Sequence, residues 1–140
     1  VIAVDSSPEM LDAARDLLNG AENVELKRGE LERLPIEDAA LNAAVFSLVL
    51  HHVPDPGEAI AEAARTLAPG GHLLIVDMMR HDRREYQQQM GHVWLGFDRE
   101  QVEGWCEAAG LNDLIWRPVP AEPDAKGPGL FVAKAGRDET

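Results

Sequence analysis

The sequence predicts an α/β domain built on a mostly parallel sheet. Three short apolar runs, at residues 1–4, 43–50 and 72–76, have the length and composition of buried strands. The segments between them carry apolar residues at helical spacing and begin with capping residues. Strands that alternate with capped helices form right-handed crossover units, because each helix must cover one face of a parallel sheet.

The first strand is the β-branched run at residues 1–4, which ends at Asp5 and has the pattern of a strand covered on both faces. A helix follows, with Ser7 as its N-cap and Pro8 at its first position. Gly20 ends this helix, and residues 24–27 alternate as a brief strand. The predicted inward face of the helix consists of Met10, Leu11, Ala14, Leu17 and Leu18.

A second strand is predicted at residues 43–50, because this apolar run is too short for a core helix. The next helix begins at Asp55 and Pro56, with Glu58 at the spacing of a capping box. Its predicted buried stripe consists of Ile60, Ala63, Ala64 and Leu67. Residues 69–71 end the helix, and the third strand runs over residues 72–76 up to Asp77.

The C-terminal part begins with residues 80–89, which contain Tyr86 as their one large apolar side chain and therefore form a polar connection or a surface helix. Asp98 then caps a helix whose inward residues are Val102, Trp105, Cys106 and Ala109. Strands are predicted at residues 111–117 and 130–134, joined by a proline-rich loop at 118–128. The last strand is expected to be antiparallel to its neighbour, because no helix separates the two.

The composition fits one folded domain over residues 1–140, with 45% hydrophobic and 27% charged residues. The net charge of −12 disfavours binding to nucleic acid or to an anionic membrane, and it suits a neutral or cationic small molecule. The one cysteine, Cys106, excludes an intrachain disulfide and fits a cytoplasmic protein. No apolar run approaches the length of a membrane span.

Four segments together resemble class I S-adenosylmethionine-dependent methyltransferases of the quinone-biosynthesis type. They are VIAVDSSPEM at 1–10, GELERLP at 29–35, LVLHHV at 48–53 and LAPGGHLLIVD at 67–77. Each segment alone is a weak signal, but the four occur in the order and at the intervals of that family. The resemblance covers nearly the whole chain and implies a Rossmann-like sheet of order 3-2-1-4-5-7-6 whose last-numbered strand is antiparallel.

The resemblance also implies a set of residues that bind S-adenosylmethionine. Asp5 would accept both ribose hydroxyls, for which a carboxylate is suited because it offers two strong acceptors. The alternative is that Asp5 is only an acid near a helix start. Met10 fits the core equally well. The full predicted cofactor set is Asp5, Ser6, Met10, Gly29, Glu30, Leu31 and Ser47.

His51 and His52 are the candidate catalytic residues, because they follow a strand end at the rim of the same crevice. One of them could orient the methyl acceptor or act as a base near neutral pH. The alternative is that the pair has no chemical role, since methyl transfer needs orientation and exclusion of water more than a dedicated base. The other histidines, His72, His81 and His92, show no metal-ligand spacing, so surface positions and no metal are expected.

Residues 80–91 are expected to form a lid or substrate wall, together with Met78, Met79, His92 and Trp94. No Gly-x-Gly-x-Gly loop precedes Val1, so the first strand and the glycine-rich loop of the family are expected to be missing. Weak cofactor binding by these residues alone follows from that expectation. Strands 1–4 and 43–50 would then either pair directly or leave a gap that another chain fills, as a homodimer or by strand exchange.

Two other functions stay open at this point. Residues 91–98 and 105–110 resemble methyltransferase domains fused behind winged-helix regulators, in which the domain senses S-adenosylmethionine or its demethylated product. A nicotinamide-dependent oxidoreductase would share Asp5, but it explains neither residues 29–35 nor the pair of histidines. Methyl transfer to a small molecule accounts for the most residues.

Overall fold

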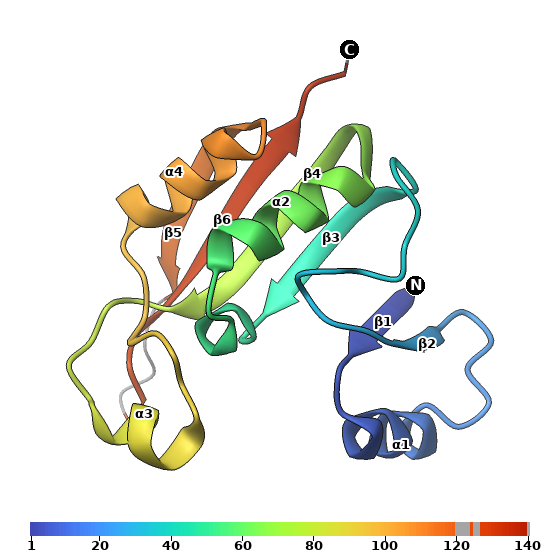
Figure 1. Ribbon diagram of the computed structural model, residues 1–140, viewed down its shortest axis with the longest axis horizontal. Coiled ribbons are helices and arrows are strands. Elements are labelled where there is room, and N and C mark those ends of the chain that lie inside the picture. The colour runs from blue at the N-terminus through green and yellow to red at the C-terminus, as the bar shows by residue number, and fades with distance from the viewer. Residues whose placement is uncertain (120–123, 125–126, 140) are drawn as a thin grey trace.

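The computed structural model describes residues 1–119, 124 and 127–139, and its larger sheet has four strands (Figure 1). Their order is β3 (Leu41–Ser47), β4 (Leu67–Met78), β6 (Leu130–Arg137) and β5 (Leu111–Val119). β3 and β4 are parallel, whereas β6 is antiparallel to both of its neighbours. This confirms the α/β class and the antiparallel final strand.

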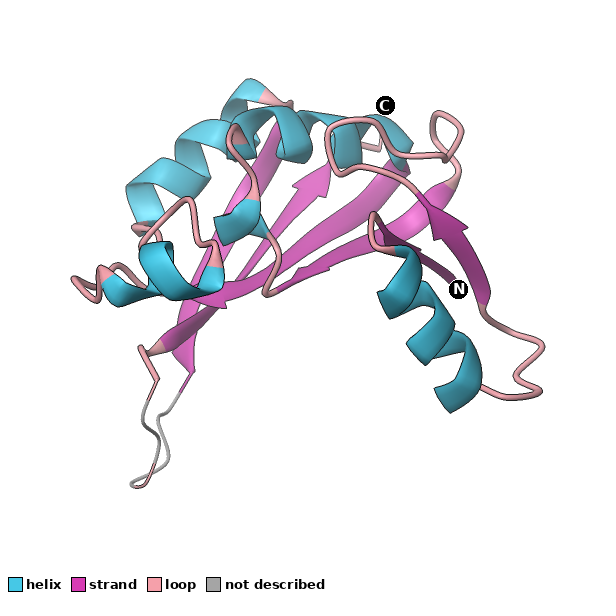
Figure 2. Cartoon of the chain, turned by 60° about the horizontal axis from the view of Figure 1, so that its bottom comes forward, coloured by secondary structure: helices cyan, strands magenta, loops and turns pink. Residues whose placement is uncertain are grey.

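The smaller sheet consists of β1 (Ile2–Asp5) and β2 (Glu25–Arg28), which are parallel and joined by α1 (Pro8–Leu17). Asp5 pairs with Arg28, and the Gly29 amide donates to the Asp5 carbonyl over 3.1 Å. The carboxyl ends of the two strands therefore lie side by side. In Figure 2 this first helix lies on the side of the strands opposite the helices that cover the larger sheet.

The two sheets are separate among the strands that the structure describes. β1 pairs with β2, and β3 pairs with β4, but β1 and β3 do not pair with each other. Of the two arrangements that the sequence left open, direct pairing of these strands is therefore wrong. A second chain between them stays a prediction.

Two helices, α2 (Pro56–Thr66) and α4 (Arg99–Ala108), cover one face of the four-stranded sheet (Figure 1). Their inward residues were largely predicted: Ala59, Ile60, Ala63, Ala64, Val102 and Cys106 are all buried. They pack against strand residues such as Leu73, Ile75 and Phe131. Burial of each large apolar side chain stabilises the fold by roughly 1.5–3 kcal/mol, so this face is the core.

The predicted helix caps are confirmed. The Ser7 hydroxyl accepts from the Met10 amide over 3.3 Å, and the Asp55 carboxylate accepts from the Glu58 amide over 3.1 Å. At the start of α4, the Asp98 amide donates to the side chain of Gln101 over 2.9 Å. These bonds satisfy backbone groups that a helix end leaves without partners.

The predicted burial of α1 is mostly wrong. Leu11 is buried, but Leu17 is 88% exposed and Met10 is 59% exposed. The reason is that α1 packs against the narrow β1–β2 pair, which covers less of a helix than a wide sheet does. No helix among the described residues has both the length and the apolar character needed to cross a membrane.

The strand predicted at residues 43–50 ends early, at Ser47. Leu48 has a positive φ of 56°, which an extended strand cannot contain, and Leu50–His52 form the short 3-10 helix η1. The two histidines therefore lie on a tight turn. The connection at 80–89 contains the surface helix α3 (Glu85–Met90), as predicted, and the proline-rich loop at 118–128 lies partly outside the described residues.

Candidate functional site

A pocket of about 530 Å³ lies at the carboxyl ends of β1 and β2, next to the turn that follows β3. This volume falls in the range of small-molecule sites. Its lining includes six of the seven residues predicted to bind the cofactor: Asp5, Ser6, Met10, Gly29, Glu30 and Leu31. The remaining lining residues are Val4, Glu32, Val49, His52, Val53 and Pro54.

Ser47 is the predicted cofactor residue that the structure does not bring into this pocket. It is exposed at the end of β3. The turn at Leu48 redirects the chain, so Val49 and the segment 52–54 line the pocket instead. Local sequence did not reveal this turn, because leucine rarely takes a positive φ.

The Asp5 side chain is held at the carboxyl end of β1 by a nearby backbone amide. One carboxylate oxygen, Oδ1, accepts a hydrogen bond from the Ser7 amide over 2.9 Å. The side chain is half-buried and lines the pocket. An ionised carboxylate has several acceptor sites, so Asp5 keeps the capacity to accept from a pair of neighbouring hydroxyls.

Gly29 allows the following loop to return to β1. A Cβ atom at this position would lie 2.6 Å from Pro35 Cδ and 3.3 Å from Val4 Cγ1. Only glycine therefore permits residues 30–35 to fold closely against the strand. This close approach is what places Glu30 and Leu31 in the pocket.

Glu62 and Arg65 of α2 hold the same loop from the other side. The Leu34 amide donates to Glu62 Oε1 over 2.9 Å, and the two side chains form an ion pair of 2.7 Å. The hydrogen bond from Arg65 lowers the pKa of Glu62 below its ordinary value of 4.5, and the bond from Leu34 adds to this effect. The loop at residues 30–35 is thus anchored to α2.

His51 is paired with Asp77, and both side chains are buried. The ring Nδ1 lies 2.7 Å from Asp77 Oδ1, and the His51 amide donates to Asp77 Oδ2 over 3.3 Å. A carboxylate on Nδ1 fixes the imidazole tautomer and leaves Nε2 free. Asp77 was not predicted as a site residue, although it lies at the end of a buried strand as Asp5 does.

The rings of His51, His52 and His92 form one cluster. The ring centroid of His51 lies 4.2 Å from that of His52 and 4.1 Å from that of His92. His52 Nδ1 lies 3.2 Å from the Gly91 carbonyl, and the amides of Val93 and Trp94 donate to the His51 carbonyl. The segment that follows α3 is therefore fastened to η1.

Two of the three histidines predicted to be on the surface, His81 and His92, are half-buried. Among the residues that the structure describes, His92 Nδ1 and His81 Nε2 are buried atoms without a hydrogen-bond partner. Burial lowers the pKa of His92, and the neighbouring His51 and His52 lower it further. Burial likewise lowers the pKa of His81. His72 is exposed, as predicted.

The two aromatic residues of the predicted lid, Tyr86 and Trp94, lie in different surroundings, and the lid itself stays a prediction. The Tyr86 ring lies 5.2 Å from that of His92, beside the histidine cluster. Trp94 instead donates through Nε1 to the Val53 carbonyl over 3.0 Å and packs against Phe97 and Trp105. It is partly buried and packs against the core.

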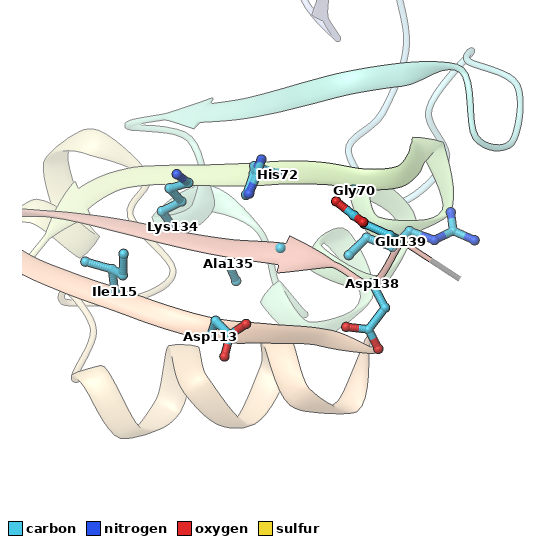
Figure 3. Close-up of a pocket in the computed structure, with 10 residues that line it drawn as sticks. Gly70, His72, Asp113, Ile115, Lys134, Ala135, Asp138 and Glu139 are labelled. Carbon is cyan, nitrogen blue, oxygen red and sulfur yellow. The ribbon is translucent and has the colours of Figure 1, made fainter.

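A second pocket, of about 310 Å³, lies near the end of β6 (Figure 3). His72 of β4, Lys134 of β6 and Ile115 of β5 line it, together with the acids Asp113, Asp138 and Glu139. It contains none of the predicted cofactor or catalytic residues. The pocket at β1 and β2 is therefore the candidate site.

Comparisons with known proteins identify the family of the chain. The family model described as a methyltransferase domain matches residues 1–75. An uncharacterized methyltransferase of Mycobacterium tuberculosis is 38% identical over 102 residues, covering 73% of this chain and 40% of that protein. The demethylmenaquinone methyltransferase of Clavibacter sepedonicus is 34% identical over 149 positions, covering 86% of this chain and 60% of that protein.

A solved structure shows the same fold. A SAM-dependent methyltransferase from Methanosarcina mazei superposes with a TM-score of 0.79 at 16% identity, covering 100% of this chain and 82% of that one. The chain spans less than two thirds of the length of the two relatives named above. It belongs to the methyltransferase domain family and has the class I S-adenosylmethionine-dependent methyltransferase fold that its sequence predicts.

Proposed function

We propose that the chain forms the nucleoside-binding part of an enzyme that transfers a methyl group from S-adenosylmethionine to a small molecule. One observation carries this proposal: six residues that the resemblance marks for the cofactor, distant in sequence, line a single pocket. Family membership alone would not carry it, because one fold hosts several activities.

The chemistry of the pocket fits the adenosyl group. Asp5 offers carboxylate acceptors to ribose hydroxyls, and Glu30 offers an acceptor to the amino group of adenine. Met10, Leu31 and Val49 supply apolar contacts for a flat ring. The acids Asp5, Glu30 and Glu32 also favour a ligand with positive charge, such as a sulfonium.

When bound, S-adenosylmethionine supplies an electrophilic methyl group. The residues of this chain orient the ligand and exclude water from it, which is the main requirement of an in-line displacement. We assign the role of base to the His51–His52 pair for a hydroxyl or amine acceptor. His52 lines the pocket, and His51 is held ready by Asp77.

The sensor function predicted from the sequence differs from this proposal in one respect. A sensor binds S-adenosylmethionine or its demethylated product but transfers no methyl group. The acidic pocket fits the ligand in both cases, so binding alone does not separate them. Transfer of the radiolabelled methyl group to an acceptor separates the enzyme from the sensor.

The test uses the full-length protein and methyl-labelled S-adenosylmethionine. Binding is measured by calorimetry, and transfer is measured with a panel of small-molecule acceptors or a cell extract. We expect Asp5→Asn to weaken binding at least tenfold and the matched control Asp12→Asn, on the exposed surface of α1, to leave it unchanged.

The same assay tests the histidines. Replacing His52 by Gln should lower transfer by about 10²–10⁴-fold, the usual size of a general-base contribution, with cofactor binding preserved. Binding without transfer to any acceptor would support the sensor instead. Consumption of reduced nicotinamide in place of label transfer would contradict both.

A further inference from the structure

The histidine cluster has the composition of a metal centre. His51, His52 and His92 each offer one ring nitrogen, and these three nitrogens lie within 4.8 Å of one another. The residues come from two segments about 40 positions apart, the turn η1 and the chain that follows α3. Their meeting therefore depends on the fold.

Hydrogen-bond partners also orient two of the three rings in the cluster. Asp77 contacts Nδ1 of His51 at 2.7 Å, and the Gly91 carbonyl contacts Nδ1 of His52 at 3.2 Å. Metal-binding histidines characteristically donate their second ring nitrogen to a carboxylate or a backbone carbonyl, which fixes the tautomer and turns the other nitrogen toward the ion. Asp77 is such a carboxylate for His51, and the Gly91 carbonyl is such a partner for His52.

The third histidine has an unused buried nitrogen. Nδ1 of His92 is inaccessible to solvent and has no hydrogen-bond partner among the described residues. Buried polar atoms are nearly always satisfied in folded proteins, and one that is not calls for a ligand, water or ion. The ring centroid of His92 lies 4.1 Å from that of His51 and 4.9 Å from that of His52, which favours a metal ion shared by the three rings.

We propose that His51, His52 and His92 bind a divalent transition metal ion of the zinc class. Three neutral imidazoles suit Zn²⁺, Co²⁺, Ni²⁺ or Cu²⁺, whereas Mg²⁺ and Ca²⁺ prefer oxygen ligands. With bonds of about 2.1 Å, two nitrogens on a tetrahedral zinc lie roughly 3.4 Å apart. The three nitrogens, which lie within 4.8 Å of one another, would move closer together when the ion binds.

The site borders the pocket, because His52 belongs to both. Three protein ligands leave a fourth position open, as in catalytic zinc sites. A hydroxyl or thiol of the methyl acceptor bound there would lose its proton more readily. This last consequence rests on the proposed function, and the metal would then take over the role of the two histidines as base, because a ring nitrogen bound to a metal cannot accept a proton. The binding of the metal does not rest on the proposed function.

The test measures metal binding directly, without cofactor or acceptor. Full-length protein without a histidine tag is freed of metal with a chelator and titrated with Co²⁺, which gives a visible absorption band when bound by three histidines. We expect one equivalent to bind and Zn²⁺ to displace it. Replacement of His92 by Gln should weaken binding by more than about 100-fold, because it removes a direct ligand.

Two further variants make the result specific. Asp77→Asn keeps all three ligands and should weaken binding by about 10–100-fold, the usual effect of a lost outer-shell partner. His72→Gln, on the exposed surface of β4, should bind Co²⁺ as the wild type does. Circular dichroism confirms that each variant is folded.

The proposal is overturned if the wild type gives no stoichiometric band, or if folded His92→Gln and His52→Gln proteins bind as tightly as the wild type. Failure of the methyltransferase proposal would appear separately, as loss of cofactor binding or methyl transfer with the Co²⁺ titration intact.

Discussion

Asp77 Oδ1 lies 2.7 Å from His51 Nδ1, and this contact joins the end of β4 to the turn after β3. The carboxylate also accepts from the amides of Met78 and His51. Three hydrogen bonds offset the cost of burying its charge. The position of His51 is thereby fixed whether it acts as a base or as a metal ligand.

Replacing Asp77 by Asn should lower the free energy of unfolding by about 1.5–3 kcal/mol, the contribution of hydrogen bonds to a charged group. Urea denaturation at pH 7 measures the change. Asp16→Asn, on the exposed side of α1, is the matched control and should shift stability by less than about 0.5 kcal/mol. Equal effects of the two substitutions would show that the buried contact contributes nothing.

Gly29→Ala should destabilise the protein by roughly 1–3 kcal/mol, because the new Cβ would meet Pro35 at 2.6 Å. The control is Gly104→Ala in α4, where a Cβ meets nothing within 4 Å. That substitution should stabilise the protein by about 0.5–1 kcal/mol through helix propensity. Thermal unfolding of both variants measures the two changes. A Gly29→Ala protein as stable as the wild type would contradict the close approach of Pro35 to Gly29.

Ionisation of Glu62 makes the free energy of unfolding depend on pH. Its pKa is lowered in the folded protein, chiefly by Arg65, so its contribution is present above its ordinary value of 4.5 and is lost as the pH falls through the folded value. We expect Glu62→Gln to be about 1 kcal/mol less stable at pH 7 and the difference to disappear at a pH well below 4.5.

Urea denaturation at the two pH values measures this gap. The control is Glu22→Gln, at an exposed position outside the helices, which should show no gap at either pH. A constant difference for Glu62→Gln across the range would mean that its ionised form is not the stabilising one.

Cys106 should be unreactive in the folded protein. It is 1% exposed, and burial raises the pKa of its thiol to about 11, so little thiolate forms near neutral pH. A thiol reagent at pH 8 should therefore modify it slowly in buffer and quickly in urea. Rapid labelling without denaturant would place Cys106 outside the core.

Local signals in the sequence were enough for most of the fold. Ser7, Asp55 and Asp98 mark helix starts by chemistry that acts within three residues. The strand that ends at Asp5 is marked by its own apolar run. The resemblance to a known family then placed six residues in one pocket.

What could not be predicted depends on contacts between distant segments. His92 reaches His51 across 41 positions, and Asp77 reaches it across 26, and neither distance leaves a periodic signal. The turn at Leu48 places Ser47 outside the pocket because the backbone there overrides the preference of leucine. Leu17 is exposed because the sheet under α1 is narrow.

The decisive measurement for the proposed cofactor site is a titration of the isotope-labelled protein with S-adenosylmethionine. It is followed by amide chemical shifts, which report weak as well as tight binding. We predict that the shifts that change belong to Asp5, Ser6, Met10 and residues 29–31, and that Asp5→Asn requires at least tenfold more ligand for the same changes. Changes confined to other residues, or no change at millimolar ligand in the full-length protein, would contradict the proposed site.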